Sequence, residues 1–169
     1  MASYKRFEDL PVWQAAIDLG LKLFALTDDH AFDYQGDLRS QLRRAALSIS
    51  NNIAEGFERG TTNELLMFLY IARGSAGEVR SMLLFTERMT RIASATNAGN
   101  LKSQISDLKS AAESCSRQLG AWAESLQNTD IRGPRYLDDR TRQSYDQQQR
   151  TAAFLEKLKA VRNNGADGH

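Results

Sequence analysis

Arginine is the residue type with the clearest potential for chemistry in this chain. The segment RSQLRRAALSISNNIAEGFERG, residues 39–60, carries Arg39, Arg43 and Arg44 near its start and Arg59 near its end. A guanidinium stays charged at physiological pH, and its planar fork of donors fits a carboxylate or a phosphate. On a helix, Arg39 and Arg43 lie one turn apart beside an apolar stripe, whereas Arg44 points away. These arginines are candidates either for ion pairs within the fold or for binding nucleic acid.

Motifs of catalysis and metal binding are missing from the sequence. It contains two histidines, His30 and His169, and one cysteine, Cys115, with no HExxH, paired CxxC, Gly-rich phosphate loop or EExxH pattern. Cys115 falls on an apolar seam, where a small buried side chain is its simplest role. We expect a protein that is not an enzyme and that holds no metal and no cofactor.

The composition fits a soluble domain. The chain has 169 residues, of which 41% are hydrophobic and 25% are charged, and its formal net charge is +1. So small a charge argues against a general affinity for polyanions and leaves only a local basic patch. A single cysteine fits a reducing compartment, and we find no signal peptide and no apolar run of membrane-spanning length. We expect a cytoplasmic protein without a membrane partner.

Helical periodicity dominates the sequence, so the fold is predicted to be all-α. A first helix should begin near Pro11 and end around Thr27. A second helix follows, and Thr61 and Glu64 have the spacing of a capping box that starts a third. The second helix has one predicted buried stripe: Leu38, Leu42, Ala45, Ala46, Ile49, Ile53 and Phe57.

The third predicted helix, at about residues 62–90, has two apolar faces. Its core stripe consists of Leu65, Leu69, Ala72, Ala76, Val79 and Leu83. Roughly opposite lies a second face of apolar and small residues: Leu66, Tyr70, Gly74, Gly77, Leu84 and Phe85. One bundle interior cannot bury both faces, and the two glycines would let another backbone approach closely. Self-association through Leu66, Tyr70, Gly74, Gly77 and Leu84 is the simplest explanation.

The fourth predicted helix alternates apolar residues by four and three, which is the spacing of a bundle seam. This seam consists of Leu101, Ile105, Leu108, Ala112, Cys115, Leu119, Trp122 and Leu126. The composition then becomes polar after a Gly133-Pro134 break. We therefore expect a bundle domain at residues 1–128 and a polar C-terminal arm at 129–169, helical in part with a frayed end.

Three stretches resemble a known family: FEDLPVWQAAIDL at 7–19, LRSQLRRAALSISNNIAEGFERG at 38–60 and ELLMFLYIARGSAGEV at 64–79. Over residues 7–127 the chain is similar to the proteins encoded in intervening sequences of bacterial 23S rRNA genes. The resemblance implies an antiparallel up-down four-helix bundle that assembles as a ring-like homopentamer. It also implies kinship with the accessory variability proteins of diversity-generating retroelements, which associate with reverse transcriptase and nucleic acid. Ser50 departs from the family, in which relatives often carry proline there.

Three hypotheses on function remain open. The first is an oligomer that binds nucleic acid, most simply structured RNA, through arginine patches multiplied by symmetry. Its candidate residues are Arg39, Arg43, Arg44, Arg59 and Arg73 in the bundle, and Arg132, Arg135, Arg140 and Arg142 in the arm. The second is a protein adaptor or scaffold, for example for a reverse transcriptase. The third is an enzymatic role that no motif reveals.

Overall fold

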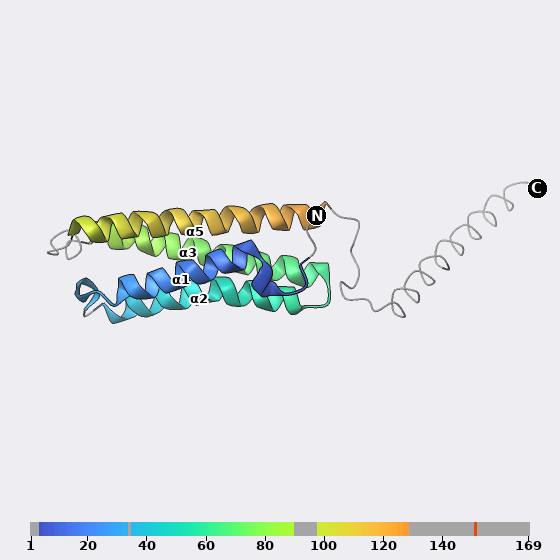
Figure 1. Ribbon diagram of the computed structural model, residues 1–169, viewed down its shortest axis with the longest axis horizontal. Helices are drawn as coiled ribbons and strands as arrows, with labels where there is room; N and C mark the ends of the chain where they lie inside the picture. Colours follow the sequence, from blue (N-terminus) through green and yellow to red (C-terminus); the bar gives the residue numbers. More distant parts are fainter. Residues whose placement is uncertain (1–3, 34, 90–97, 129–150, 152–169) are drawn as a thin grey trace, which may run out of the picture. The chain divides into compact units, whose positions relative to one another are not determined.

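The computed structural model describes residues 4–33, 35–89, 98–128 and 151. These residues form four α-helices and no β-strand, which confirms the predicted all-α class for this part of the chain (Figure 1). The helices are α1 (Pro11–Thr27), α2 (Gly36–Glu58), α3 (Thr62–Arg88) and α5 (Ala98–Gln127), with short 3-10 turns η1 (Phe7–Asp9) and η2 (His30–Phe32). The predicted arm at 129–169 lies outside the described residues, apart from Thr151.

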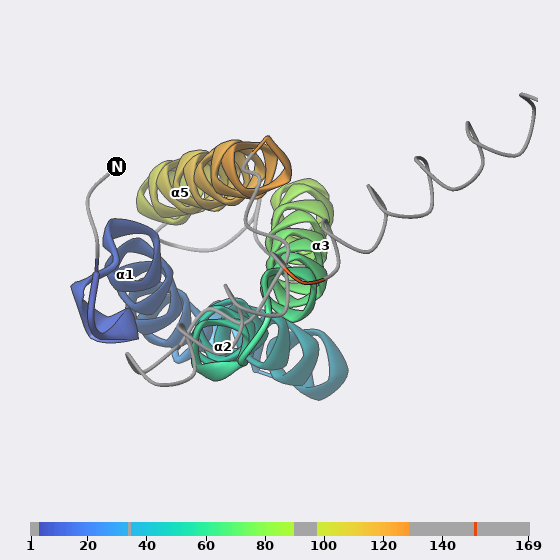
Figure 2. The ribbon, with the colours of Figure 1, turned by 90° about the vertical axis from the view of Figure 1, so that its right-hand side faces the viewer.

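The four helices pack as a bundle around one core. Viewed along the bundle, α1 and α3 lie on opposite sides, and α2 and α5 each touch both of them (Figure 2). The contacts of α3 with α2 and with α5 are the most extensive. α3 therefore has two neighbours within the bundle and one face directed outward.

The predicted apolar stripes form the core. All six residues of the α3 core stripe are buried, and so is the α2 stripe from Leu42 to Phe57, while Leu38 at its start is half-buried. The α5 seam is buried from Leu101 to Leu119. At its end the structure differs from the prediction, because Ala123 is buried whereas Trp122 and Leu126 are half-buried against the core. An α-helix has 3.6 residues per turn, so a strict heptad stripe drifts off the core-facing side.

The helix boundaries follow from local chemistry. Pro11 stands at the first position of α1, where its missing N–H is not needed. The predicted cap of α3 is present in part: the Thr61 hydroxyl accepts from the Glu64 backbone N–H at 3.3 Å, but the Glu64 carboxylate accepts from that hydroxyl at 2.8 Å instead of from the Thr61 backbone N–H of a full capping box. The first contact satisfies one of the donors that the first turn of a helix otherwise leaves free.

The contact between α2 and α3 is close at Gly56. A Cβ atom at this position would lie 2.6 Å from Cβ of Phe68 and 3.2 Å from Cδ1 of Leu65. A polar seam continues along the same interface, where the Ser48 and Ser75 hydroxyls are 2.9 Å apart. The absence of a side chain at Gly56 lets the two helices approach.

Ser50, at which the resemblance leads us to expect proline, is buried in α2. Its side chain is 3% exposed, and its hydroxyl donates to the backbone oxygen of Leu47 at 3.2 Å. The hydroxyl thus has a partner within its own helix, so serine is accommodated without an unsatisfied buried group.

Candidate nucleic-acid interface

Arg43 is bound within the bundle. Its Nη2 donates to Oδ1 of Asp28 at 2.6 Å, and its Nε donates to the hydroxyl of Thr27 at 2.8 Å. The guanidinium also lies over the ring of Phe24, 4.7 Å from the ring centroid. Only 21% of the Arg43 side chain is exposed. Arg43 therefore links the end of α1 to α2 and offers little free surface to a ligand.

Arg39 shares the same carboxylate. Its Nη2 donates to Oδ1 of Asp28 at 3.0 Å, and 38% of its side chain is exposed. The hydrogen bond from Arg43, and then the charges of both arginines, lower the pKa of the Asp28 carboxyl. The structure thus brings Arg39 and Arg43 together around one acid, as the structural alternative predicts; a role in binding nucleic acid stays a prediction.

Arg59 lies at the other end of α2 and is also paired. Its Nη2 donates to Oε1 of Glu55 at 2.6 Å, and its guanidinium lies 5.1 Å from the ring centroid of Phe68. The hydrogen bond to Glu55 raises the pKa of Arg59. Since 46% of the side chain remains exposed, Arg59 can still meet a partner at the surface.

Arg44 and Arg73 differ from the other three. Both are exposed, and among the residues that the structure describes no carboxylate forms an ion pair with either of them. Arg44 lines a notch of about 290 Å³ between α2 and α3, together with Gln41, Ser48 and Glu78, whose carboxylate forms no ion pair with Arg44 among the described residues. Arg73 lines a groove of about 570 Å³ between α3 and α5. These two guanidiniums are the bundle candidates best placed to take an external anion.

Sequence reasoning missed Arg117. This residue of α5 lines the groove that contains Arg73, and it forms an ion pair with Glu113 at 3.3 Å. The heptad pattern of α5 identifies only the residues of its buried side. The position of Arg117 next to α3 is visible only in the tertiary structure. The arm candidates Arg132, Arg135, Arg140 and Arg142 lie outside the described residues.

The outward face of α3 is apolar, but its members differ from those predicted. Tyr70 is 45% exposed, and Gly74 and Gly77 have no heavy atom within 4 Å of the position that a Cβ would take. Leu66 and Leu84 are half-buried, so they offer less surface than expected. Phe85, which is predicted on this face, is 61% exposed, and two residues that are not predicted there are exposed as well: Met67 at 52% and Ile71 at 45%. Leu66 follows the buried Leu65 on the flank of α3, where its side chain packs partly against the core instead of pointing outward.

Two further features are absent from the part of the chain that the structure describes. No group of three or more histidine, cysteine, aspartate or glutamate side chains there could hold a metal ion. In the same residues, no helix combines the length and the apolar character that crossing a membrane requires.

The sequence from Glu8 to Ala121 matches the family model described as 23S rRNA-intervening sequence protein. This chain belongs to that family. The match runs from the η1 turn through most of α5, which confirms the resemblance drawn from residues 7–127. No curated protein matches the chain.

Proposed function

We propose that this intervening sequence protein is a non-enzymatic homo-oligomer that binds nucleic acid, in the first place structured RNA. The observation that carries the proposal is that Arg44 and Arg73 are exposed and unpaired among the described residues of a chain with almost no net charge. A guanidinium that already has a carboxylate partner gains little from a phosphate, whereas a free one gains a charge-assisted hydrogen bond. The association of the family with an rRNA gene makes RNA the first ligand to test.

We infer an antiparallel up-down bundle that assembles as a ring, with five subunits as the expected number. Only residues 59–61 connect α2 to α3, which favours opposite directions for these neighbours. Ring symmetry would repeat each subunit's two free arginines around one surface. Such repetition explains how a chain with a net charge of +1 could attract a polyanion. We place this assembly in the cytoplasm, without metal or cofactor.

Neutralising the two free arginines should weaken RNA binding. We expect the Arg44→Gln/Arg73→Gln variant to lose affinity for a structured RNA hairpin. The slope of log K against log salt should become shallower by about 1.8, since each lost phosphate contact removes about 0.9. Fluorescence anisotropy with a labelled hairpin, repeated over a salt series, measures both quantities.

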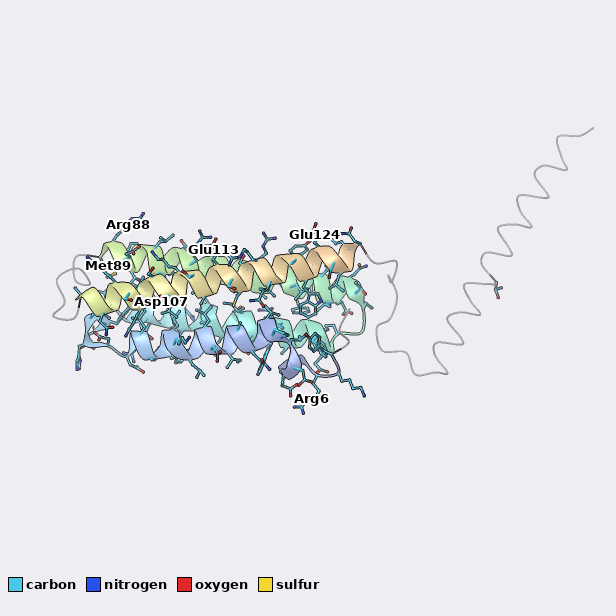
Figure 3. The ribbon with its side chains drawn as sticks, turned by 45° about the horizontal axis from the view of Figure 1, so that its top comes forward. Arg6, Arg88, Met89, Asp107, Glu113 and Glu124 are labelled. Carbon is cyan, nitrogen blue, oxygen red and sulfur yellow. The ribbon has the colours of Figure 1, made fainter. Side chains whose placement is uncertain are left out.

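The control for this test is Arg6→Gln/Arg80→Gln, which changes the net charge equally but removes arginines that already have a carboxylate partner. Arg6 is 68% exposed and bound to Glu8 (Figure 3), and Arg80 is 50% exposed and paired with Glu113. This control should keep the salt slope of the unmodified protein. Equal losses in the two variants would mean that net charge, rather than the two free arginines, attracts the RNA.

A protein adaptor, for example for a reverse transcriptase, is the second candidate function. The exposed apolar residues Met67, Ile71 and Phe85 favour it, since an apolar helix face of this kind is typical of a protein contact. Capture of a protein partner that is insensitive to salt would support this alternative, because counterion release makes nucleic-acid binding strongly salt-dependent.

Self-association should depend on the outward face of α3. We expect light scattering of the unmodified protein to give about five times the 18.9 kDa of one chain. Gly74→Leu should shift this mass toward the monomer, because a bulky side chain blocks close approach in an oligomer. Within the monomer the same change meets no atom within 4 Å, so the fold should remain intact.

Ile71→Arg and Leu21→Arg form a matched pair for this test. Both residues are exposed: Leu21 on α1 at 67% and Ile71 on α3 at 45%. Only the α3 change should dissociate the oligomer. A monomeric mass for the unmodified protein would contradict the assembly as a whole.

A further inference from the structure

Two ion pairs join α3 to α5, and their α3 members are one heptad apart. The Lys109 ammonium of α5 lies 2.7 Å from the Glu87 carboxylate of α3. One heptad earlier on α3, the Arg80 guanidinium lies 3.7 Å from the carboxylate of Glu113. The next position in this series is Arg73. An acid on α5 opposite Arg73 would continue the pattern.

α5 provides no such acid. The guanidinium carbon of Arg73 instead lies 3.5 Å from the position that a Cβ of Gly120 would occupy. Arg117 lines the same groove but is paired with Glu113 at 3.3 Å, so Arg73 is the groove's cation without an ion pair among the described residues. Glu124 also lines the groove, near the end of α5, but it forms an ion pair with neither arginine among the described residues (Figure 3). The groove therefore has room for an external anion at Arg73.

An aromatic ring completes the groove. Tyr70 lies one helical turn before Arg73 and is 45% exposed. Its hydroxyl accepts a hydrogen bond from Nε2 of Gln127 at 2.8 Å, which links the ring to α5. Proteins that bind single-stranded nucleic acid combine these features: cations that follow the phosphates and aromatic faces on which bases stack. A base in a duplex has no free face, so the ring favours an unpaired strand.

We propose that the α3–α5 groove, formed by Tyr70, Arg73, Arg117 and Gly120, binds a single-stranded segment of nucleic acid. A base stacks on Tyr70, and a backbone phosphate contacts Arg73, whereas Arg117 lines the groove and keeps its ion pair with Glu113. Because Gly120 has no side chain, the groove has room for both the strand and the Arg73 side chain. This inference rests on the proposed function and narrows it from RNA in general to an unpaired stretch, such as the loop of a hairpin.

Binding to a labelled oligouridylate of about twelve nucleotides tests the groove. Tyr70→Leu should weaken binding about tenfold, whereas Tyr70→Phe, which keeps the ring, should not. Arg73→Gln should reduce the salt slope by about 0.7, the contribution of one phosphate contact of a single strand, whereas Arg117→Gln should change it little. Arg6→Gln, which removes an arginine paired with Glu8, is the charge-matched control and should leave the slope unchanged.

Gly120→Leu tests the groove without changing any charge. Its side chain would fill the space beside Arg73, where only the movable end of that arginine lies nearby. We expect the variant to fold, as measured by circular dichroism, and to bind the oligouridylate at least about tenfold more weakly, comparable to the loss of one stacked base. An RNA duplex of equal length should bind less tightly than the single strand and should respond little to this substitution.

The outcomes distinguish the groove from the broader function. If the unmodified protein binds RNA but Tyr70→Leu and Gly120→Leu bind equally well, the groove is wrong and RNA binding stands. If the unmodified protein binds neither strand nor duplex, both proposals fail. Light scattering accompanies each measurement, since Tyr70 also belongs to the proposed self-association face. Binding lost only together with the oligomer, and retained by Gly120→Leu, would likewise overturn the groove.

Discussion

Gly56→Ala should lower the free energy of unfolding by about 3 kcal/mol, the upper end of the usual cost of overpacking a core. The added Cβ would lie 2.6 Å from Cβ of Phe68, a distance that packed carbon atoms do not adopt. Both atoms are fixed to their backbones, so no change of rotamer can separate them, and α2 must move away from α3. Thermal unfolding followed by circular dichroism should show a midpoint lower by about 10 °C.

Gly20→Ala is the matched control. Gly20 lies within α1, and no heavy atom stands within 4 Å of the position that its Cβ would take. The same chemical change should therefore raise the free energy of unfolding by about 0.5–1 kcal/mol, because alanine favours a helix over glycine. Opposite signs for the two variants are the expected result. A Gly56→Ala protein as stable as the unmodified one would contradict the close approach of α2 and α3.

Arg43→Ala should destabilise the bundle by about 2 kcal/mol, within the range for hydrogen bonds to charged groups. It removes the donor to the Thr27 hydroxyl and the cation over the Phe24 ring, both at a largely buried position. Arg43→Lys should recover only part of the loss, because one ammonium cannot reproduce the fork that reaches Thr27 and Asp28 together. Urea denaturation with a constant m-value would provide the difference in stability.

The next residue supplies the control for Arg43. Arg44→Ala removes an exposed guanidinium without an ion pair among the described residues, so the stability should change by no more than about 0.5 kcal/mol. Their effects on RNA binding should be reversed: the salt slope should respond to Arg44 and not to Arg43. A lower slope and an unchanged stability in Arg43→Ala would return Arg43 to the RNA-binding surface.

The same contacts predict a dependence on pH. Because Arg43 lowers the pKa of the Asp28 carboxyl in the folded protein, the carboxylate stabilises the fold above the ordinary pKa of aspartate. This contribution should be lost as the pH falls below about 4 and through the lower pKa of the folded state. Asp28→Asn should therefore reduce the difference in melting temperature between neutral and acidic solution.

Much of the bundle could be predicted because helical periodicity is a local property of the sequence. The buried stripe from Leu65 to Leu83 can be predicted from the spacing of its apolar residues along the chain. The cap formed by Thr61 and Glu64 likewise spans only one turn. The partial exposure of Trp122 and Leu126 could not be predicted equally well, since it depends on how far the neighbouring helices cover the end of α5.

The candidate site was less predictable, because the use of an arginine depends on its neighbours in space. Helical spacing separates Arg44 from Arg39 and Arg43, but no local pattern identifies Asp28, at the end of α1, as the partner of the latter two. Arg117 entered the site because α5 packs on α3 and brings it into the groove with Arg73. Periodicity contains no information about distances between helices.

The sequence by itself determined the all-α class, the family, the buried faces of the helices and the supply of arginines. Only the tertiary structure decided which guanidiniums are paired, which remain free and which apolar side chains of α3 stay exposed. The physical reason is range: propensity, capping and amphipathic spacing act within a few residues along the chain. Ion pairs and grooves instead require atoms from different helices to meet within a few ångströms.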